Sequence, residues 1–257
     1  MNSLFRMLVL FPISIGVVFS KLILSTTRSG FIYLNTVVLL FLHFAIVPAI
    51  IQQENNAPVV KINAPKNNAV VEAGATVNYE IDVADKEDGN SKYDELNNKE
   101  ILLEVKLVKD RSNPAMVAAA SRALTIMRTS NCFNCHNFNS KSIGPSFYEI
   151  SKRYPVTAAN TDSLVKRIRM GSSEAWGKEK MPAHPELTRE EIKATASWIL
   201  KHAADPGIDY YIGATGTFRI KKTGMYRLTA TYLDHGQKNA PGKQRLQGHD
   251  VIYINNK

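Results

Sequence analysis

Apolar and polar residues alternate with a period of two in two separated parts of the chain, which predicts β-strands in both. A strand that buries one face places every second side chain in the core. Before residue 112 the apolar members of this alternation are Val60, Ile62, Val77, Tyr79, Ile81, Val83, Ile101, Leu103, Val105 and Leu107. After residue 206 they are Phe218, Ile220, Tyr226, Leu228, Ala230, Tyr232, Ile252 and Ile254. We therefore expect strands in residues 57–112 and again in 207–257, with a loop over residues 234–248.

Between these two parts the spacing of apolar residues becomes helical. Asn113 and Pro114 are typical of a helix start, and the alanines that follow them allow a neighbouring helix to approach closely. Thr188 and Glu191 have the spacing of a capping box, in which each side chain satisfies the other residue's backbone N–H. The apolar stripe after this box consists of Ile192, Ala196, Ile199 and Leu200. We expect residues 113–205 to be a helical domain with Trp198 in its core and a last helix that continues to His202.

The two β segments are each too small for an independent domain. Three strands alone are marginally stable in water, whereas six or seven close a two-layer sandwich. We therefore predict a multi-domain α and β protein, in which residues 57–112 and 207–257 form one immunoglobulin-like sandwich and the helical domain is inserted between them. The alternative is two small β segments that pack separately on the helical domain.

A long uncharged run near the N-terminus predicts export. Residues 31–51 contain no charged side chain over 21 positions, which suits a membrane span or the apolar region of a signal peptide. Val47 and Ala49 satisfy the small-residue rule for cleavage, while two spans would place Lys21 and Arg28 in a short cytoplasmic loop. Both alternatives, a cleaved leader or an anchor over residues 1–51, place the remainder outside the cytoplasmic membrane, in the periplasm or cell envelope.

Composition narrows the class of protein further. A hydrophobic content of 44% is high enough for packed cores and excludes a wholly disordered chain. The formal net charge is +9, but an exported chain without an aromatic and basic groove pattern is not expected to bind nucleic acid.

The two cysteines carry the strongest chemical signal. Cys132, Cys135 and His136 form the C-x-x-C-H pattern of covalent c-type haem attachment, with His136 as the proximal iron ligand. Three alternatives are weaker. A thioredoxin-like pair needs a βαβ setting, a zinc site needs further ligands, and a disulfide across two residues closes too short a loop to stabilise much.

The sixth iron ligand must come from another part of the chain. Met181 and His184 lie on one proline-bounded segment, and they are the two main candidates. Met170 lies in a helix-like stretch, where packing is the expected role. The remaining candidates are His202, Met225, His235 and His249. Methionine would give a higher reduction potential than histidine.

Several separated motifs make residues from about 115 to 204 resemble a short bacterial class I cytochrome c. They are the attachment site, the Ile143-Gly144-Pro145 loop, and Trp176 followed five positions later by Met181. The resemblance implies that the Pro145 carbonyl orients His136, that Arg167 and Trp176 lie near the haem propionates, and that Met181 is the distal ligand. A bis-histidine haem is the main alternative.

The order of motifs also resembles the C-terminal region of secreted bacterial dehydrogenase–cytochrome fusions. An acidic V-x-D-K-E-D-G segment precedes the haem domain, and a strand with the pattern G-x-Y-x-L-T-A-x-Y-x-D follows it. No segment of dehydrogenase size precedes residue 57, so the resemblance implies a dehydrogenase partner that is a separate chain. Clustered carboxylates at Asp82, Asp85, Glu87 and Asp88 fit calcium, although a solvated acidic turn is the more common arrangement.

With both axial positions filled, a haem has no open site for substrate, so we expect an electron carrier and not an enzyme. Residues 115–205 carry 13 basic and 8 acidic side chains, which favours acidic redox partners or an anionic membrane. Lys178 and Lys180 are the candidates for a docking rim. A dehydrogenase donor, and a terminal oxidase or another cytochrome as acceptor, are the expected partners. The alternatives are a peroxidase or gas-binding haem with a displaceable ligand, and a surface or scaffold protein.

Overall fold

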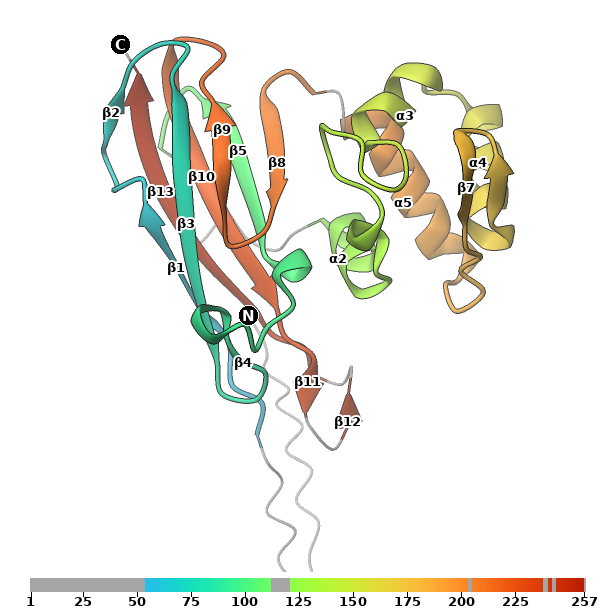
Figure 1. The fold of residues 1–257 in the computed structure, drawn as a ribbon, viewed down its shortest axis with the longest axis horizontal. Coiled ribbons are helices and arrows are strands. Elements are labelled where there is room, and N and C mark those ends of the chain that lie inside the picture. The colour runs from blue at the N-terminus through green and yellow to red at the C-terminus, as the bar shows by residue number, and fades with distance from the viewer. Residues whose placement is uncertain (1–53, 112–120, 203–204, 238–239, 242–243, 257) are drawn as a thin grey trace, which may run out of the picture. The chain divides into compact units, whose positions relative to one another are not determined.

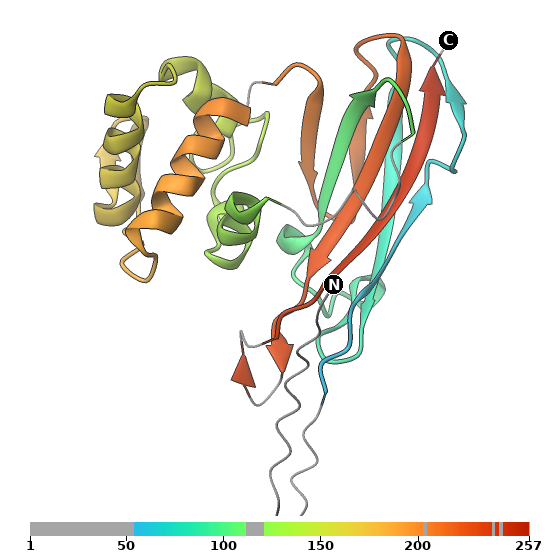
Figure 2. The ribbon, with the colours of Figure 1, turned by 180° about the vertical axis from the view of Figure 1, so that it is seen from behind.

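The structure is a computed structural model, and it describes residues 54–111, 121–202, 205–237, 240–241 and 244–256. The predicted leader, residues 1–51, lies outside these ranges. Residues 53–257 form one compact unit. Within it, the middle of the chain forms a group of helices, and strands come before and after these helices in the sequence (Figures 1 and 2). Among the described residues, no helix is both long and apolar enough to cross a membrane.

A five-stranded sheet combines strands from before and after the helices. Its order is β2 (Val70–Val71), β13 (Gln247–Asn256), β10 (Gly224–Leu233), β5 (Leu102–Val108) and β8 (Ile208–Ile212). Strand β5 precedes the helices in sequence, yet it pairs antiparallel with β10 and β8, which both follow them. The helical segment therefore begins after β5 and ends before β8, which are neighbouring strands of one sheet.

The second sheet is built in the same way. It contains β1 (Val59–Ala64), β3 (Thr76–Asp85), β4 (Gly89–Asn90) and β9 (Thr215–Arg219), with β9 paired to β3 across the inserted helices. A small hairpin belongs to neither sheet. It pairs two strands of two residues each, β11 (Gly236–Gln237) and β12 (Ala240–Pro241). The short 3-10 helices η1 (Ser91–Tyr93) and η2 (Asn98–Glu100) connect β4 to β5.

One hydrophobic core joins the two sheets. The alternation in β3 is confirmed, because Val77, Tyr79, Ile81 and Val83 are at most 7% exposed while the polar residues between them are more exposed. The core also contains Val60, Ile62, Ile101, Leu103, Val105, Phe218, Ile220, Tyr226, Leu228, Ala230, Tyr232, Ile252 and Ile254. Every apolar position predicted from the period of two is in this core or packed against it. Strand β8 was not predicted, because Ile208–Ile212 is an edge strand that lacks the alternation.

The helical segment contains α2 (Arg122–Thr129), α3 (Phe147–Arg153), α4 (Ala158–Met170) and α5 (Arg189–His202). The predicted capping box before α5 is confirmed, since Thr188 and Glu191 exchange hydrogen bonds of 2.8–3.2 Å. A second capping box, Ser146 with Glu149, starts α3. The helix predicted at Asn113 lies on residues 112–120, outside the described ranges, and the helix that follows begins at Arg122 with Ser121 as its N-cap.

The helices share a second core with the five-stranded sheet. Phe138 lies 5.0 Å from the ring of Tyr210 on β8, and Trp198 on α5 lies 5.5 Å from it. Leu102 of β5 belongs to the same buried cluster. Trp198 is 7% exposed, so its predicted core position is confirmed.

Candidate haem site

The two cysteines lie in a tight turn directly after α2. Asn131 has φ of 60°, and this left-handed residue turns the chain into the 3-10 helix η4 (Cys132–Asn134). The backbone N–H groups of Cys135 and His136 both donate to the carbonyl of Cys132, at 3.2 and 3.0 Å. Both cysteines line one cavity together with His136, and no disulfide joins them. Burial raises the pKa of Cys132 to about 12, as expected for a thiol in apolar surroundings.

The imidazole of His136 is held in one orientation. Its Nδ1 lies 2.6 Å from the carbonyl oxygen of Pro145, and the ring stacks on Phe147 at 5.4 Å. A carbonyl only accepts, so Nδ1 carries the proton and donates, which leaves Nε2 with a free lone pair. Burial lowers the pKa of His136, against the opposing effect of the Pro145 hydrogen bond, and favours the neutral ring that a metal requires.

Gly144 makes room for this histidine. A Cβ atom at Gly144 would lie 2.5 Å from Cε1 and 2.9 Å from Nδ1 of His136, closer than real side chains approach. The Gly144 N–H donates to the carbonyl of Cys135 at 2.8 Å, which fixes the loop against the attachment turn. In the Ile143-Gly144-Pro145 segment, the glycine therefore leaves space for the His136 ring, and the Pro145 carbonyl accepts a hydrogen bond from it.

Met181 lines the same cavity as His136. It ends strand β7 (Gly177–Met181), which pairs with β6 (Ser172–Glu174) in a hairpin that follows α4. Gly171 has φ of +80°, and a Cβ there would lie 2.8 Å from the Met181 carbonyl, so this position needs a glycine. The prolines around Met181 predicted an extended segment, whereas the hairpin was not predicted.

The other described ligand candidates do not line this cavity. His184 is close in sequence, but its Nδ1 pairs with Glu186 Oε1 at 2.8 Å. The expected packing role of Met170 is wrong, because this residue ends α4 with 72% of its surface exposed. Met225 and His249 belong to the strands β10 and β13, and His235 follows β10. For His202 the structure describes the backbone only.

Trp176 and Arg167 line the cavity near the β6–β7 hairpin. Arg167 lies 5.9 Å from the ring of Tyr154 and donates to Ser172 Oγ at 3.3 Å. Arg153 was not predicted; its guanidinium stacks 4.5 Å from the Trp176 ring and donates to the carbonyl of Ala175 at 2.7 Å. Its position ends α3, and no motif in the sequence marks it. Arg167 and Trp176 line the cavity together with Glu179 and Lys180, and Arg153 stacks on the indole. The arginines suit anionic groups such as propionates.

The remaining wall of the cavity is mainly apolar. Its apolar members are Ile126, Met127, Ile143, Pro145, Phe147, Ile150, Leu164, Ile168, Ala175, Pro182, Leu187 and Ile199. Thr195 on α5 also lines the cavity, although it was not among the predicted site residues. The helical spacing could have identified Thr195 as a buried residue, because it lies on the apolar stripe between Ile192 and Ile199. The donor set, the glycine cradle and this apolar wall fit a covalently attached haem, held by the two thiols and His136.

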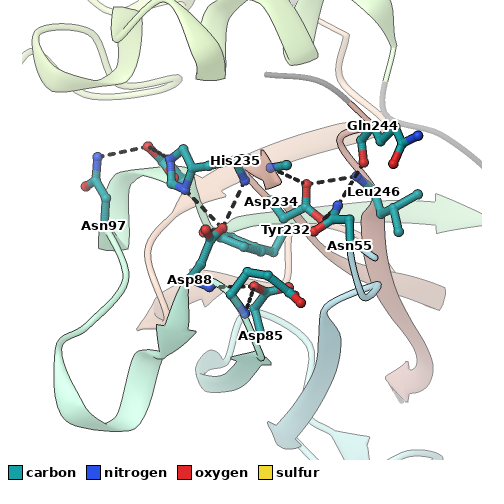
Figure 3. A network of polar contacts seen from close by, with 12 residues as sticks. Asn55, Asp85, Asp88, Asn97, Tyr232, Asp234, His235, Gln244 and Leu246 are labelled. Atoms are coloured by element: carbon teal, nitrogen blue, oxygen red, sulfur yellow. Dashed lines mark hydrogen bonds and ion pairs between the residues drawn. The ribbon is translucent and has the colours of Figure 1, made fainter. Parts of the chain in front are cut away.

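The acidic segment at the end of β3 is a partly buried turn held by a network of hydrogen bonds. Asp85 is 7% exposed, and its Oδ1 accepts from the backbone N–H groups of Glu87 and Asp88 at 2.9 and 2.7 Å. Asp88 Oδ2 accepts from the Tyr232 hydroxyl at 3.0 Å and from the backbone N–H of His235 at 2.9 Å (Figure 3). The described residues contain no group of three or more His, Cys, Asp or Glu side chains arranged for a metal. The carboxylates of Asp85 and Asp88 therefore act as hydrogen-bond acceptors that stabilise this turn.

Comparisons with known proteins match the helical segment that contains this cavity. The Cytochrome c family profile matches residues 120–203. Cytochrome c-551 of Azotobacter vinelandii is 38% identical over 77 residues, which cover 30% of this chain and 93% of the relative. Cytochrome c-552 of Hydrogenobacter thermophilus is 32% identical over 75 residues, covering 29% of this chain and 76% of the relative. The chain therefore belongs to the cytochrome c family.

A solved structure is similar to part of this chain. The crystal structure of wild-type Nitrosomonas europaea cytochrome c552 is 31% identical, with a TM-score of 0.29, and the match covers 30% of this chain and 95% of that one. Members of the cytochrome c family bind haem c covalently, and the pair Cys132 and Cys135 fits their C-x-x-C-H motif. The homologues support a haem c electron-transfer protein, and the two β sheets lie outside the matched residues.

Proposed function

We propose that the chain is an exported mono-haem cytochrome c that transfers single electrons through a haem ligated by His136 and Met181. The observation that carries the proposal is the 2.6 Å contact between His136 Nδ1 and the Pro145 carbonyl, which leaves Nε2 free in a cavity that Met181 also lines. When bound there, haem supplies one iron that changes between Fe(III) and Fe(II).

The residues around the site have separate tasks in this proposal. Cys132 and Cys135 would hold the haem covalently, and His136 and Met181 would supply the two protein ligands of its iron. The apolar wall excludes water, which limits the rearrangement that accompanies a change of iron charge. Arg153, Arg167 and Trp176 receive the propionates. Because both axial ligands come from the protein, the site has no position for a substrate, and the chain acts as a carrier and not as an enzyme.

Docking partners are proposed to approach at the two lysines of the β6–β7 hairpin. Lys178 and Lys180 are exposed on β7, and Lys180 also lines the haem cavity. The net charge of +5 over residues 115–205 suits an acidic partner that binds briefly. We propose a dehydrogenase on a separate chain as donor, and a terminal oxidase or another cytochrome as acceptor.

The N-terminal leader and the two sheets complete the proposed function. Residues 1–51 act as a signal peptide or an anchor, and the rest of the chain lies in the periplasm or cell envelope. The two sheets form an immunoglobulin-like sandwich from residues 57–112 and 207–257, interrupted by the cytochrome domain. Pairing of β5 with β10 and of β3 with β9 supports this arrangement.

The test is the visible spectrum of the haem-loaded full chain, with Met181→Ala compared against His184→Ala. Met181→Ala should abolish the weak far-red sulfur-to-iron band and allow the reduced protein to bind carbon monoxide. His184→Ala should leave both properties unchanged. Loss of the native spectrum in His184→Ala alone would show a bis-histidine haem. A wild-type chain that lacks the band and binds carbon monoxide would favour a gas-binding or peroxidase function.

A further inference from the structure

Thr195 is a polar residue in an apolar part of the haem cavity. It lies on α5, its side chain lines the cavity together with His136 and Met181, and it is 3% exposed. Its Oγ1 atom is fully buried and has no hydrogen-bond partner among the residues that the structure describes. The neighbouring positions of the stripe, Ile192 and Ile199, are apolar and also buried.

A buried hydroxyl without a partner destabilises a protein, because it loses its hydrogen bonds to water and gains none in return. A valine would fill nearly the same volume at this position without that cost. The packing of α5 therefore gives no reason for a threonine at position 195. Thr195 instead faces the haem cavity, which His136 and Met181 also line.

We propose that Thr195 tunes the haem, and that its hydroxyl lowers the reduction potential of the iron. This inference rests on the proposed function, because it requires haem in this cavity. The oxidised haem carries one more positive charge than the reduced haem. A hydroxyl whose proton is not committed to a protein acceptor is free to turn its oxygen toward that charge, and in apolar surroundings the effect is not screened by water.

The redox step itself remains a simple electron transfer. The electron that reduces the iron would come from the donor protein, and Thr195 keeps its proton throughout. Only the orientation and the stabilising effect of the hydroxyl differ between the two states. Removal of the hydroxyl is therefore expected to destabilise Fe(III) and to raise the midpoint potential.

The experiment measures midpoint potentials of the haem-loaded full chain by spectroscopic titration. In Thr195→Val the ratio of reduced to oxidised protein at a fixed potential should rise roughly two- to tenfold, the range that one net hydrogen bond spans. Thr195→Ser should stay close to wild type, while Thr195→Ala should shift in the same direction as Thr195→Val. The far-red sulfur-to-iron band should persist in all three, since none of them replaces an axial ligand.

Thr229 provides a matched control in the same chain. It lies on β10, is 6% exposed, and its Oγ1 also has no partner among the described residues, but it does not line the haem cavity. Thr229→Val should leave the potential unchanged. If Thr195→Val and Thr195→Ala shift the potential no more than Thr229→Val does, the inference is wrong although the proposed function stands. A wild-type chain that binds no haem would overturn both.

Discussion

Arg128 of α2 donates a hydrogen bond from Nη2 to the hydroxyl of Thr231 on β10, at 2.9 Å. Arg128 is 3% exposed, and burial lowers its pKa to about 10, partly offset by the nearby carboxylate of Glu100. Its Nε and Nη1 atoms have no partner among the described residues. The helix that leads into the haem-attachment turn is thus joined to the five-stranded sheet by a buried cation with few partners.

Thr231→Val should therefore destabilise the whole chain. The substitution leaves Nη2 of Arg128 buried without an acceptor, and we expect the free energy of unfolding to fall by about 1–3 kcal/mol. Urea denaturation followed by circular dichroism measures the change. Adding Arg128→Met should recover part of the loss, because the buried charge is then removed together with its acceptor.

Thr217→Val is the control for this pair, because Thr217 is an exposed residue of β9. Its unfolding midpoint should match that of wild type. Equal midpoints for Thr231→Val and Thr217→Val would show that the Arg128 contact contributes nothing to stability.

Tyr210 is expected to stabilise the core that the helices share with the sheet. Its ring lies 5.0 Å from Phe138 and 5.5 Å from Trp198, and its hydroxyl donates to Glu104 at 3.2 Å. Tyr210→Ala should cost about 3–5 kcal/mol, as deletions of large buried rings do. Tyr210→Phe removes only the hydrogen bond and should cost about 1 kcal/mol. Denaturation monitored by tryptophan fluorescence compares the two variants; similar losses would mean that the ring contributes little.

Much of the architecture follows from local patterns in the sequence. Much of the core of the two sheets comes from positions that alternate apolar and polar residues, and in β3 the alternation alone assigns Val77–Val83 to a strand with one buried face. Thr188 and Glu191 mark the start of α5 because residues of these types at this spacing form a capping box. The attachment turn, the Gly144 loop and Met181 are recognisable because each has a fixed residue type at a fixed spacing.

Other features depend on tertiary contacts that leave no local signal. Strand β8 has residues such as Tyr210 that face the helical core, so its polar and apolar positions do not alternate. Arg153 contributes to the site through stacking on Trp176, a contact between α3 and a distant hairpin. Asp85 has the local sequence of a solvated turn, and nothing near it in the sequence reveals that Tyr232 and His235 cover this region.

His235 should make stability depend on pH above neutrality. Its Nε2 lies 3.1 Å from Glu100 and its Nδ1 lies 3.0 Å from Asp88 (Figure 3), and these carboxylates raise its pKa to about 9. Because the folded pKa exceeds the unfolded value of about 6.5, the stabilisation is fully present below pH 6.5 and is lost as pH rises to about 9. The side chain is 48% exposed, so water screens the pair and we expect a loss of about 1 kcal/mol.

Urea denaturation at pH 6.5, 7.5, 8.5 and 9.5 measures this dependence. His235→Gln should flatten the decline, whereas His249→Gln, at an exposed position of β13, should keep it. The same slope in wild type and His235→Gln would assign the pH dependence to other groups.

Gly144→Ala is expected to displace His136 and to reduce haem attachment. The new Cβ would lie 2.5 Å from Cε1 of the imidazole, so either the ring or the Gly144 loop must move. Moving the ring stretches the 2.6 Å contact with Pro145 that orients Nε2, and moving the loop breaks the bond between Gly144 N–H and the Cys135 carbonyl. Overpacking of this kind costs about 1–3 kcal/mol. The ratio of covalent haem to protein, measured by haem absorbance after denaturation, should fall. Gly207→Ala is the control, since its Cβ would meet only the flexible carboxylate of Asp205 at 3.3 Å, and full haem content in Gly144→Ala would contradict the proposed cradle.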